Sequence, residues 1–458
     1  MPSTFCKPLE KGLSRAVARG TKTTPSPASP TDLVFFSLLD RSMRLLYFTA
    51  HQIWPINTGA RLRDYQLARQ LAARFSVTFV EMRHAGEEHT MPPDGSGLTS
   101  VVTLDKGRTY SAFKILRGLA GPTPLTVLNC WSLRLASELA DVLQSRQFDT
   151  VQIEGMQLMK YLPVIRKAPG CPATVVDWHN IESELMWRYA KTAGNPLKRV
   201  AAWRMAKLIE RAENRLLDTC DTHIVTSERE RQKLLARHPG ANIQVIPNGV
   251  DAGYYSPKQI AEACRRTGQC DSRRTILFVG SMDYHANIDA VTWFSRAVWP
   301  EIARNHPDVK FTIVGRDPAP EVRALASDRI DVIGTVDDVR PFYASAVAVV
   351  VPLRSGSGTR LKILEAMAAG VAVVSTRLGA EGIDAENDVH LLLADGGPEI
   401  AAAVGRVVSS AETRARLSAA ARAFVVSRYD WTVVSEQLCR IHCDLVRPRQ
   451  LSSFPKGL

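Results

Sequence analysis

Short apolar runs recur along the chain from Met43 onward, and amphipathic or polar stretches separate them. In the first half, helical periodicity covers 61–74, 131–146 and 197–217. Short β-rich runs that alternate with helices predict parallel strands joined by βαβ crossovers. The runs of this half that predict buried strands are "RLLYFT", "VTFV", "TVQIE", "TVVDW", "THIVTS" and "IQVIPN".

A second alternating series follows a polar break at 252–272, which we interpret as a linker. The strands expected in this series are "TILFVG", "VKFTIVG", "IDVIG", "AVAVVVPL", "VAVVST" and "VHLLLAD", and the helices are 287–305, 320–327, 339–344, 360–369 and 399–408. The pattern therefore predicts two α/β domains, 43–251 and 273–428. If the two domains face each other, ligands are expected in the cleft at the carboxyl ends of the strands.

The ends of the chain differ from these domains. Residues 1–42 include the segment "TKTTPSPASPT", which cannot build a core. They are expected to be a disordered extension, unless translation begins at Met43. We expect 429–446 to form a C-terminal helix that packs back towards the N-terminal domain, and 447–458 to be a tail.

The composition indicates which partners the protein favours, and it argues against several classes of protein. The net charge of +12 favours anionic partners, or else reflects solubility alone. The cysteines lack the repeated Cys-x-x-Cys spacing of a zinc site, so we expect no metal site and a chain with reduced thiols. No run approaches the ~18 apolar residues that span a bilayer. A cytoplasmic location is expected, and no motif supports nucleic-acid binding.

The stretch "PLRSGSGTRLKILEAMAAG" has the most evident chemistry. A buried strand ends in a turn, and a helix then runs from Arg360 to a stop at Gly370. Glycines let an anion approach the free N–H groups at a helix N-terminus. The turn residues are Gly356, Ser357, Gly358 and Thr359.

Two cations begin this helix, although its dipole disfavours them there by roughly 0.3–1 kcal/mol each. Arg360 and Lys362 therefore predict a bound anion that offsets the cost. Glu365, one turn beyond Lys362, could accept hydrogen bonds from sugar hydroxyls. The alternative is an ordinary surface pair of Lys362 with Glu365.

This stretch, continued as "VAVVSTRLGAEGI", closely resembles the donor-site motif of glycosyltransferase family 4, the group 1 type. The resemblance covers about Met43 to His442, and within the family the chain looks like sugar transferases of exopolysaccharide or cell-envelope assembly. Further motifs occur in the family's order, namely "IPNGVD", "FVGSMDYHANIDAVTWF", "FTIVGRDPAP" and "YDWTVVSEQL".

The resemblance implies an α/β fold of the GT-B type, with two facing Rossmann-like domains and a central cleft. It implies a retaining transfer from a nucleotide-diphosphate sugar to a glycan or lipid-linked acceptor, with no metal and no cofactor. Glu365 matches the second glutamate of the family's Glu-x7-Glu motif, which holds the nucleotide ribose.

The sequence departs from the family pattern twice. Ser357 stands at the first glutamate of Glu-x7-Glu, so the identity of the donor sugar does not carry over. The loop "GSMDYHAN" lacks the arginine and lysine that grip the diphosphate in many members. We expect Arg360 and Lys362 to supply that charge, beside the backbone of Gly280 and Ser281.

The N-terminal domain offers two candidate elements. Asn57, Gly59 and Arg63 lie in a loop that resembles the family's first glycine-containing loop, near donor phosphate and acceptor; a capped helix start is the alternative. His179 follows a strand and matches a histidine near the donor sugar, with Asp177 and Glu182 as possible partners. The alternative for His179 is a capping or core histidine.

The helix at 197–217 carries basic residues at helical spacing. Such a face could rest on an anionic membrane that presents a lipid-linked acceptor. A domain helix with a solvated outer face is the alternative. For the whole chain, the alternatives to a transferase are a degenerate scaffold protein and an epimerase or phosphorylase of the same fold.

Overall fold

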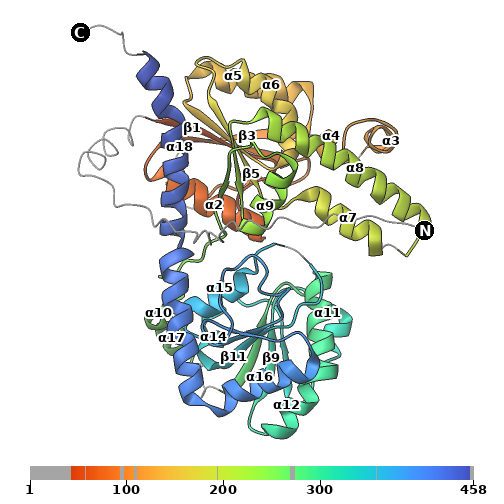
Figure 1. Ribbon diagram of the computed structural model, residues 1–458, viewed down its shortest axis with the longest axis vertical. Coiled ribbons are helices and arrows are strands. Elements are labelled where there is room, and N and C mark those ends of the chain that lie inside the picture. Colours follow the sequence, from red (N-terminus) through yellow and green to blue (C-terminus); the bar gives the residue numbers. More distant parts are fainter. Residues whose placement is uncertain are drawn as a thin grey trace, which may run out of the picture.

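The computed structural model describes residues 43–56, 58–92, 97–98, 100–107, 111–192, 194–268, 274–356 and 358–453. The extension 1–42, Asn57 and Ser357 lie outside the described residues. Two α/β domains lie one above the other in Figure 1, each with a parallel sheet between helices. The prediction of two α/β domains is confirmed.

The first domain contains a seven-stranded parallel sheet in the order β3-β2-β1-β4-β5-β6-β7. Its strands are β1 (Arg44–Thr49), β2 (Ser76–His84), β3 (Val101–Lys106), β4 (Thr150–Glu154), β5 (Ala173–Trp178), β6 (Thr222–Val225) and β7 (Ile243–Val245). Its helical elements are α2 (Gly59–Ala72), α3 (Ala112–Ala120), α4 (Leu125–Cys130), α5 (Leu133–Ser145), η1 (Met156–Tyr161), α6 (Leu162–Arg166), α7 (Glu182–Thr192), α8 (Pro196–Thr219) and α9 (Glu228–Arg237).

The second domain contains a six-stranded sheet in the order β10-β9-β8-β11-β12-β13. Its strands are β8 (Thr275–Val279), β9 (Lys310–Val314), β10 (Ile330–Ile333), β11 (Ala346–Val351), β12 (Val373–Ser375) and β13 (Leu392–Leu393). Its helical elements are α10 (Pro257–Thr267), α11 (His285–Trp293), η2 (Phe294–Val298), α12 (Trp299–Asn305), α13 (Pro320–Arg323), α14 (Arg340–Ser345), α15 (Leu361–Ala368), α16 (Gly397–Ser409) and α17 (Ala411–Arg428).

Each sheet reverses its winding direction at one point, between β1 and β4 in the first domain and between β8 and β11 in the second. In open α/β sheets, ligands bind where the strand order reverses, beyond the carboxyl ends of the strands. The loops after β1, β4, β8 and β11 are therefore the expected walls of a site. Strand β11 is buried along its whole length, as the run "AVAVVV" requires.

Helix α10 occupies most of the stretch that the sequence indicates as a linker. Ser256 caps its N-terminus by accepting a hydrogen bond from the Gln259 amide. Its apolar residues Ile260 and Cys264 are buried, and Ile260 joins the core of the second domain. The linker therefore contains an amphipathic helix that packs on the second domain.

The last helix, α18 (Trp431–Ser453), lies beside the first domain in Figure 1, and α17, which precedes it, lies beside the second. The chain crosses itself where α18 begins: the Val250 amide donates to the Tyr429 carbonyl, and the Trp431 amide donates to the Val250 carbonyl. Trp431 and Leu438 then join the apolar core beside β1 and α2. The chain passes between the domains twice, at Val250 and at Trp431, and these two segments are hydrogen-bonded to each other.

His442 fixes the far part of α18 to the first sheet. It is fully buried, with Nδ1 at 3.1 Å from Thr150 Oγ1 and Nε2 at 2.8 Å from Gln152 Oε1. The carbonyl oxygen of Gln152 accepts the Nε2 proton, so the neutral imidazole fits both partners. Burial lowers the pKa of His442 to about 3.

We predict that acid weakens this contact. The folded pKa lies below the unfolded value of about 6.5, so the stability is present above about pH 6.5 and is lost as the pH falls towards 3. At about pH 5 the loss is about 2 kcal/mol. The check is the free energy of unfolding in urea, measured for the wild type and His442→Gln at about pH 7.5 and about pH 5. The variant has no histidine at this position and should not show this loss at the lower pH. An equal loss in both proteins would contradict the assignment.

Candidate active site

A pocket of about 360 Å³ lies between the two domains. Residues of the first domain line one side, and Tyr284 with the loop and first residue of α15 line the other. The lining residues are Gly59, Ala60, Arg63, His179, Asn180, Leu185, Thr226, Asn248, Tyr284, Gly358, Thr359 and Leu361. The structure therefore brings five of the sequence-predicted residues to one cavity: Gly59, Arg63, His179, Gly358 and Thr359.

The loop between β11 and α15 needs its glycines. Gly356 has φ +108° and Gly358 has φ +79°, which side chains rarely adopt. A Cβ on Gly356 would lie 3.1 Å from Arg360 Nη2 and 3.3 Å from the Tyr284 hydroxyl. Thr359 Oγ1 is buried and has no hydrogen-bond partner among the described residues. The loop thus contributes Gly358 and Thr359 to the lining of the pocket.

Two cations stand at the start of α15. Arg360 precedes the helix, is buried, and donates from Nη1 to the Gly358 carbonyl at 2.7 Å. Lys362 Nζ donates to Asn287 Oδ1 at 3.0 Å and lies 4.0 Å from the centre of the Phe278 ring. Burial lowers the pKa of Arg360 and, with repulsion from Arg360, lowers the pKa of Lys362 to about 7.

The loop after β8 lies directly against Lys362. A Cβ on Gly280 would lie only 2.6 Å from Lys362 Nζ, so a larger residue there would displace the lysine amine. Ser281 accepts from Arg316 Nε at 2.8 Å and donates to Asp283 at 2.6 Å. Arg316, from the loop after β9, is a cation that the sequence reasoning missed. Arg316 thus brings positive charge to the loop after β8, which has no arginine or lysine of its own.

Glu365 lies one turn further along α15 and is half-buried. Its Oε2 accepts from the Tyr343 hydroxyl at 3.1 Å, and the Tyr255 hydroxyl also bonds the carboxylate. Burial raises the pKa of Glu365. The sequence reasoning missed both tyrosines. They hold the carboxylate in one position on the second domain.

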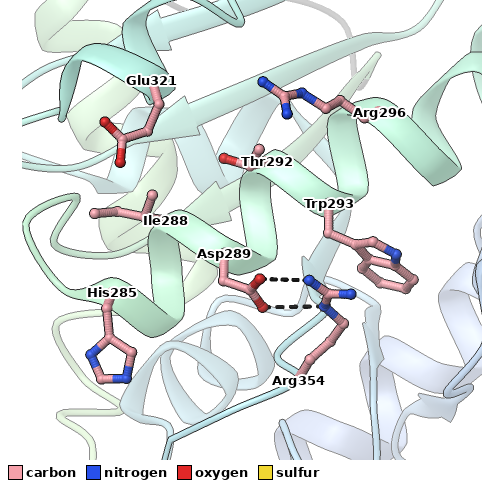
Figure 2. Close-up of a pocket in the computed structure, with 8 residues that line it drawn as sticks. All are labelled: His285, Ile288, Asp289, Thr292, Trp293, Arg296, Glu321 and Arg354. Carbon is pink, nitrogen blue, oxygen red and sulfur yellow. Dashed lines mark hydrogen bonds and ion pairs between the residues drawn. The ribbon is translucent and has the colours of Figure 1, made fainter. Parts of the chain in front are cut away.

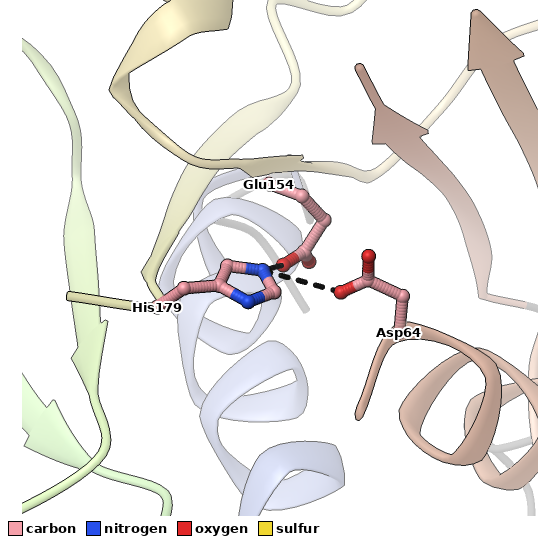
Figure 3. A group of neighbouring side chains, drawn as sticks. All are labelled: Asp64, Glu154 and His179. Atoms are coloured by element: carbon pink, nitrogen blue, oxygen red, sulfur yellow. Dashed lines mark hydrogen bonds and ion pairs between the residues drawn. The ribbon is translucent and has the colours of Figure 1, made fainter. Parts of the chain in front are cut away.

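Figure 3 shows the group around His179 in the first domain. His179 Nε2 lies 3.0 Å from Glu154 Oε2 and 3.2 Å from Asp64 Oδ1. Asp64 Oδ2 is also 2.9 Å from His51 Nε2. Glu154 ends β4 and Asp64 lies on α2, so three separate elements meet here. The partners that the sequence indicated for His179, Asp177 and Glu182, are not the ones that the structure gives it.

The charges in this group depend on one another. Burial alone would lower the pKa of His179, but Asp64 and Glu154 beside it raise that pKa well above its usual value. Burial, together with Asp177 and Asp64, raises the pKa of Glu154 to about 7. At neutral pH the imidazole is therefore protonated. Its Nε2–H faces the carboxylates, and its Nδ1 points away from them in Figure 3.

Arg63 faces the protein interior. It is buried and bonds Asp177 from Nε at 2.9 Å. Its two terminal nitrogens donate to the carbonyls of Pro247 and Ile246 and to Asn248 Oδ1. Gly59 begins α2, and a Cβ there would lie 3.5 Å from Leu361 of the second domain. Arg63 thus positions the end of β5, while Gly59 allows the domains to approach closely.

The ligand atoms of Asp64, Glu154 and His179 all lie within 4.8 Å of one another. Two carboxylates and an imidazole could hold a divalent metal such as zinc or manganese. As the residues stand, His179 Nε2 lies at hydrogen-bond distance from both carboxylates, and a metal would require the neutral imidazole. The arrangement therefore fits a hydrogen-bonded ion cluster.

A second cavity of about 490 Å³ lies on one face of α11, as Figure 2 shows. Arg354 makes two bonds to Asp289, and its guanidinium lies 5.0 Å from the centre of the Trp293 ring. The charges of Asp289 and Arg354 satisfy each other. None of the sequence-predicted residues lines this cavity.

Similar solved structures define the class of fold. Sucrose-phosphate synthase from Thermosynechococcus elongatus has a TM-score of 0.66 at 16% identity, covering 89% of this chain and 100% of that chain. HepE of Anabaena, solved in complex with UDP, has a TM-score of 0.59 at 16% identity, covering 88% of this chain and 100% of that chain. The two facing sheets are those of the GT-B class.

Two family models match the chain: Glycosyltransferase Family 4 over 59–254 and Glycosyl transferases group 1 over 273–410. The chain belongs to this family, as its motifs indicated. A phosphatidyl-myo-inositol mannosyltransferase of Mycolicibacterium smegmatis is 34% identical over 210 residues, which are 44% of this chain and 52% of that protein. The chain spans about half the length of the curated relatives it matches.

We predict that Lys362 titrates near neutral pH. In a protein with ¹³C-methylated lysines, its resonance, assigned with Lys362→Arg, should shift with a midpoint of about 7, far below the ~10.4 of an ordinary lysine. Arg360→Gln removes a neighbouring positive charge and should raise that midpoint. A wild-type midpoint above about 9 would contradict the burial of this charge.

Proposed function

We propose that this protein transfers a sugar from a nucleotide-diphosphate sugar to a hydroxyl of a glycan or lipid-linked acceptor, with retention and without a metal. The observation that carries the proposal is the cationic, glycine-lined corner of Arg360 and Lys362 beside Glu365, at a switch point of a family 4 fold. The printed activity of the mannosyltransferase relative and the UDP bound to HepE add support.

The diphosphate would occupy the corner between the loops after β8 and β11. Backbone N–H groups around Gly280 and Gly358 can approach its oxygens, because no Cβ stands in the way. Lys362 and Arg360 supply positive charge, which stabilises a leaving diphosphate without a metal ion. Binding an anion there would also relieve the cost of the buried cations. Glu365, held by its two tyrosines, would accept the ribose hydroxyls.

His179 would act on the side of the transferred sugar. Its Nε2–H is held by Asp64 and Glu154, so the imidazole has a fixed orientation. A protonated Nδ1–H donates a charge-assisted hydrogen bond, which suits a sugar hydroxyl or a developing negative charge. Asp64 and Glu154 would be positioning residues. A protonated His179 does not serve as a general base.

We predict that a panel of UDP- and GDP-sugars contains a donor that the protein hydrolyses or transfers, and that EDTA does not abolish the turnover. Glu365→Gln should weaken binding of that donor by roughly 10-fold, because it loses charged acceptors for the ribose. Glu412→Gln, on the exposed surface of the same domain, is the matched control. Nucleotide release can be followed directly.

Absence of both turnover and nucleotide binding in the wild type would refute the transferase proposal. A scaffold protein of the same fold predicts a different pattern. In cells, Glu365→Ala would then leave glycan assembly unaffected.

We also propose that the protein works at the cytoplasmic face of a membrane that holds its acceptor. Among the described residues, no helix combines the length and apolar character needed to cross a bilayer. The start of α8, however, exposes Leu197 by 81% and Val200 by 66% of their surface. Lys198 lies between them, and Lys207 Nζ lies 3.8 Å from the centre of the exposed Trp203 ring. Apolar and basic groups together favour an anionic interface.

We predict that the protein sediments with anionic vesicles at low salt and less with neutral ones. The double variant Leu197→Ser and Val200→Ser should reduce the bound fraction at least several-fold, since an apolar side chain contributes roughly 1.5–3 kcal/mol when fully buried. Val426→Ser, an exposed apolar residue of α17, is the control. If the wild type, the double variant and Val426→Ser all sediment equally with the vesicles, the start of α8 does not bind the membrane.

A further inference from the structure

Arg188 of α7 reaches across the cleft to the loop before α15. Its Nη1 donates to the Gly356 carbonyl at 3.2 Å, and its Nη2 lies 2.6 Å from Glu184 Oε1 on the same helix. Repulsion from Arg188 contributes to the low pKa of Arg360, after burial, so the two guanidinium groups are neighbours. The first domain therefore places a cation at the corner that the second domain builds.

The neighbourhood of Arg188 has more positive than negative charge. Glu184 lies 2.6 Å from Arg188, 2.5 Å from Arg229 and 2.7 Å from Lys233. Arg229 also reaches Glu381 of the second domain at 2.9 Å. Three cations thus share two carboxylates, which leaves one positive charge unbalanced. An anion that entered the corner would be attracted by the unbalanced charge.

The cations of the second domain at this corner already have partners inside the protein, and Arg316 bonds Ser281. Arg360 bonds the Gly358 carbonyl, and Lys362 bonds Asn287. The pKa of Lys362 is about 7, so without a ligand its amine is close to half-charged at neutral pH. These two residues alone give an incomplete positive charge for a group with two ionised phosphates.

Arg188 has the capacity that these residues lack. A guanidinium carries five N–H donors and stays charged at all relevant pH values. The bonds to Gly356 and Glu184 use two donors and leave three. Its side chain is 38% exposed, so a ligand in the cleft can reach it. A phosphate oxygen is a stronger acceptor than the Gly356 carbonyl, because it carries charge.

We propose that Arg188 binds the diphosphate of the donor from the side of the first domain, and so adds positive charge beside the loop "GSMDYHAN", which has no arginine or lysine of its own. This inference rests on the proposed function. A group held by Arg188 on one domain and by Arg360 and Lys362 on the other also links the two domains. Donor binding then stabilises the two domains against each other.

The experiment is calorimetric titration of the full chain with UDP and GDP, and with UMP and GMP as monophosphate probes. Arg188→Gln should weaken the tighter-binding diphosphate at least about 10-fold and change the matching monophosphate less than about 2-fold. Arg188→Lys, which keeps the charge but not the fork of donors, should fall between.

The matched control is Arg134→Gln on α5. Arg134 makes the same kind of exposed ion pair, 2.7 Å from Glu138 at i,i+4, and α5 lies at the end of its domain remote from the cleft in Figure 1. This variant should bind both nucleotides as the wild type does. Thermal melting of all variants verifies that they fold.

Two results would overturn the role of Arg188 and leave the proposed function standing. One is a diphosphate affinity of Arg188→Gln equal to the wild-type value. The other is an equal loss for diphosphate and monophosphate, which would indicate a structural role in holding the domains. If Arg188→Gln fails to fold, Arg188→Lys is used in its place. The inference is refuted if Arg188→Lys prefers the diphosphate over the monophosphate as strongly as the wild type does. Binding of neither UDP nor GDP by the wild type refutes the proposed function itself.

Discussion

Every group of the candidate site depends on one geometric constraint. All strands of a parallel sheet end at the same edge, and here two such sheets turn those edges towards each other. The residues that follow β1, β4, β8 and β11 therefore converge without being close in sequence. The second passage of the chain, at Val250 and Trp431, fastens the domains beside this cleft. Function can reside in loops because the sheets behind them are rigid.

Electrostatics then divides the cleft into two unlike halves. The second domain gathers Arg360 and Lys362 at a helix start, where burial and the helix dipole both disfavour positive charge. The first domain gathers carboxylates around His179, and they keep its imidazole charged. An anion is favoured on one side and a fixed hydrogen-bond donor is presented on the other. Such a division suits a donor with an anionic leaving group and a neutral sugar.

The sequence predicted the fold and the corner before α15 because both depend on local pattern. The run "AVAVVV" can only be a buried strand, and the glycines after it demand a turn with positive φ. The order of motifs then indicated the family. Helix α10 was harder to predict, since a polar stretch with a few spaced apolar residues also fits a linker.

The contacts that depend on distant pairing could not be predicted. Arg63 has the sequence context of an exposed arginine at a helix start, yet α2 packs so that it meets Asp177 of β5. Asp64 and Glu154 reach His179 from two other elements. Glu154 alone carried a usable signal, because it is the last residue of a buried strand at the ligand edge of the sheet. No local pattern marks Arg188 as facing the other domain.

A crystal structure with a bound nucleoside diphosphate would show directly where the donor binds. We expect the diphosphate against the loops at Gly280 and Gly358, within hydrogen-bond distance of Lys362, with the ribose at Glu365. A nucleotide bound instead in the cavity on α11, or a cleft that stays empty at saturating ligand, would contradict it.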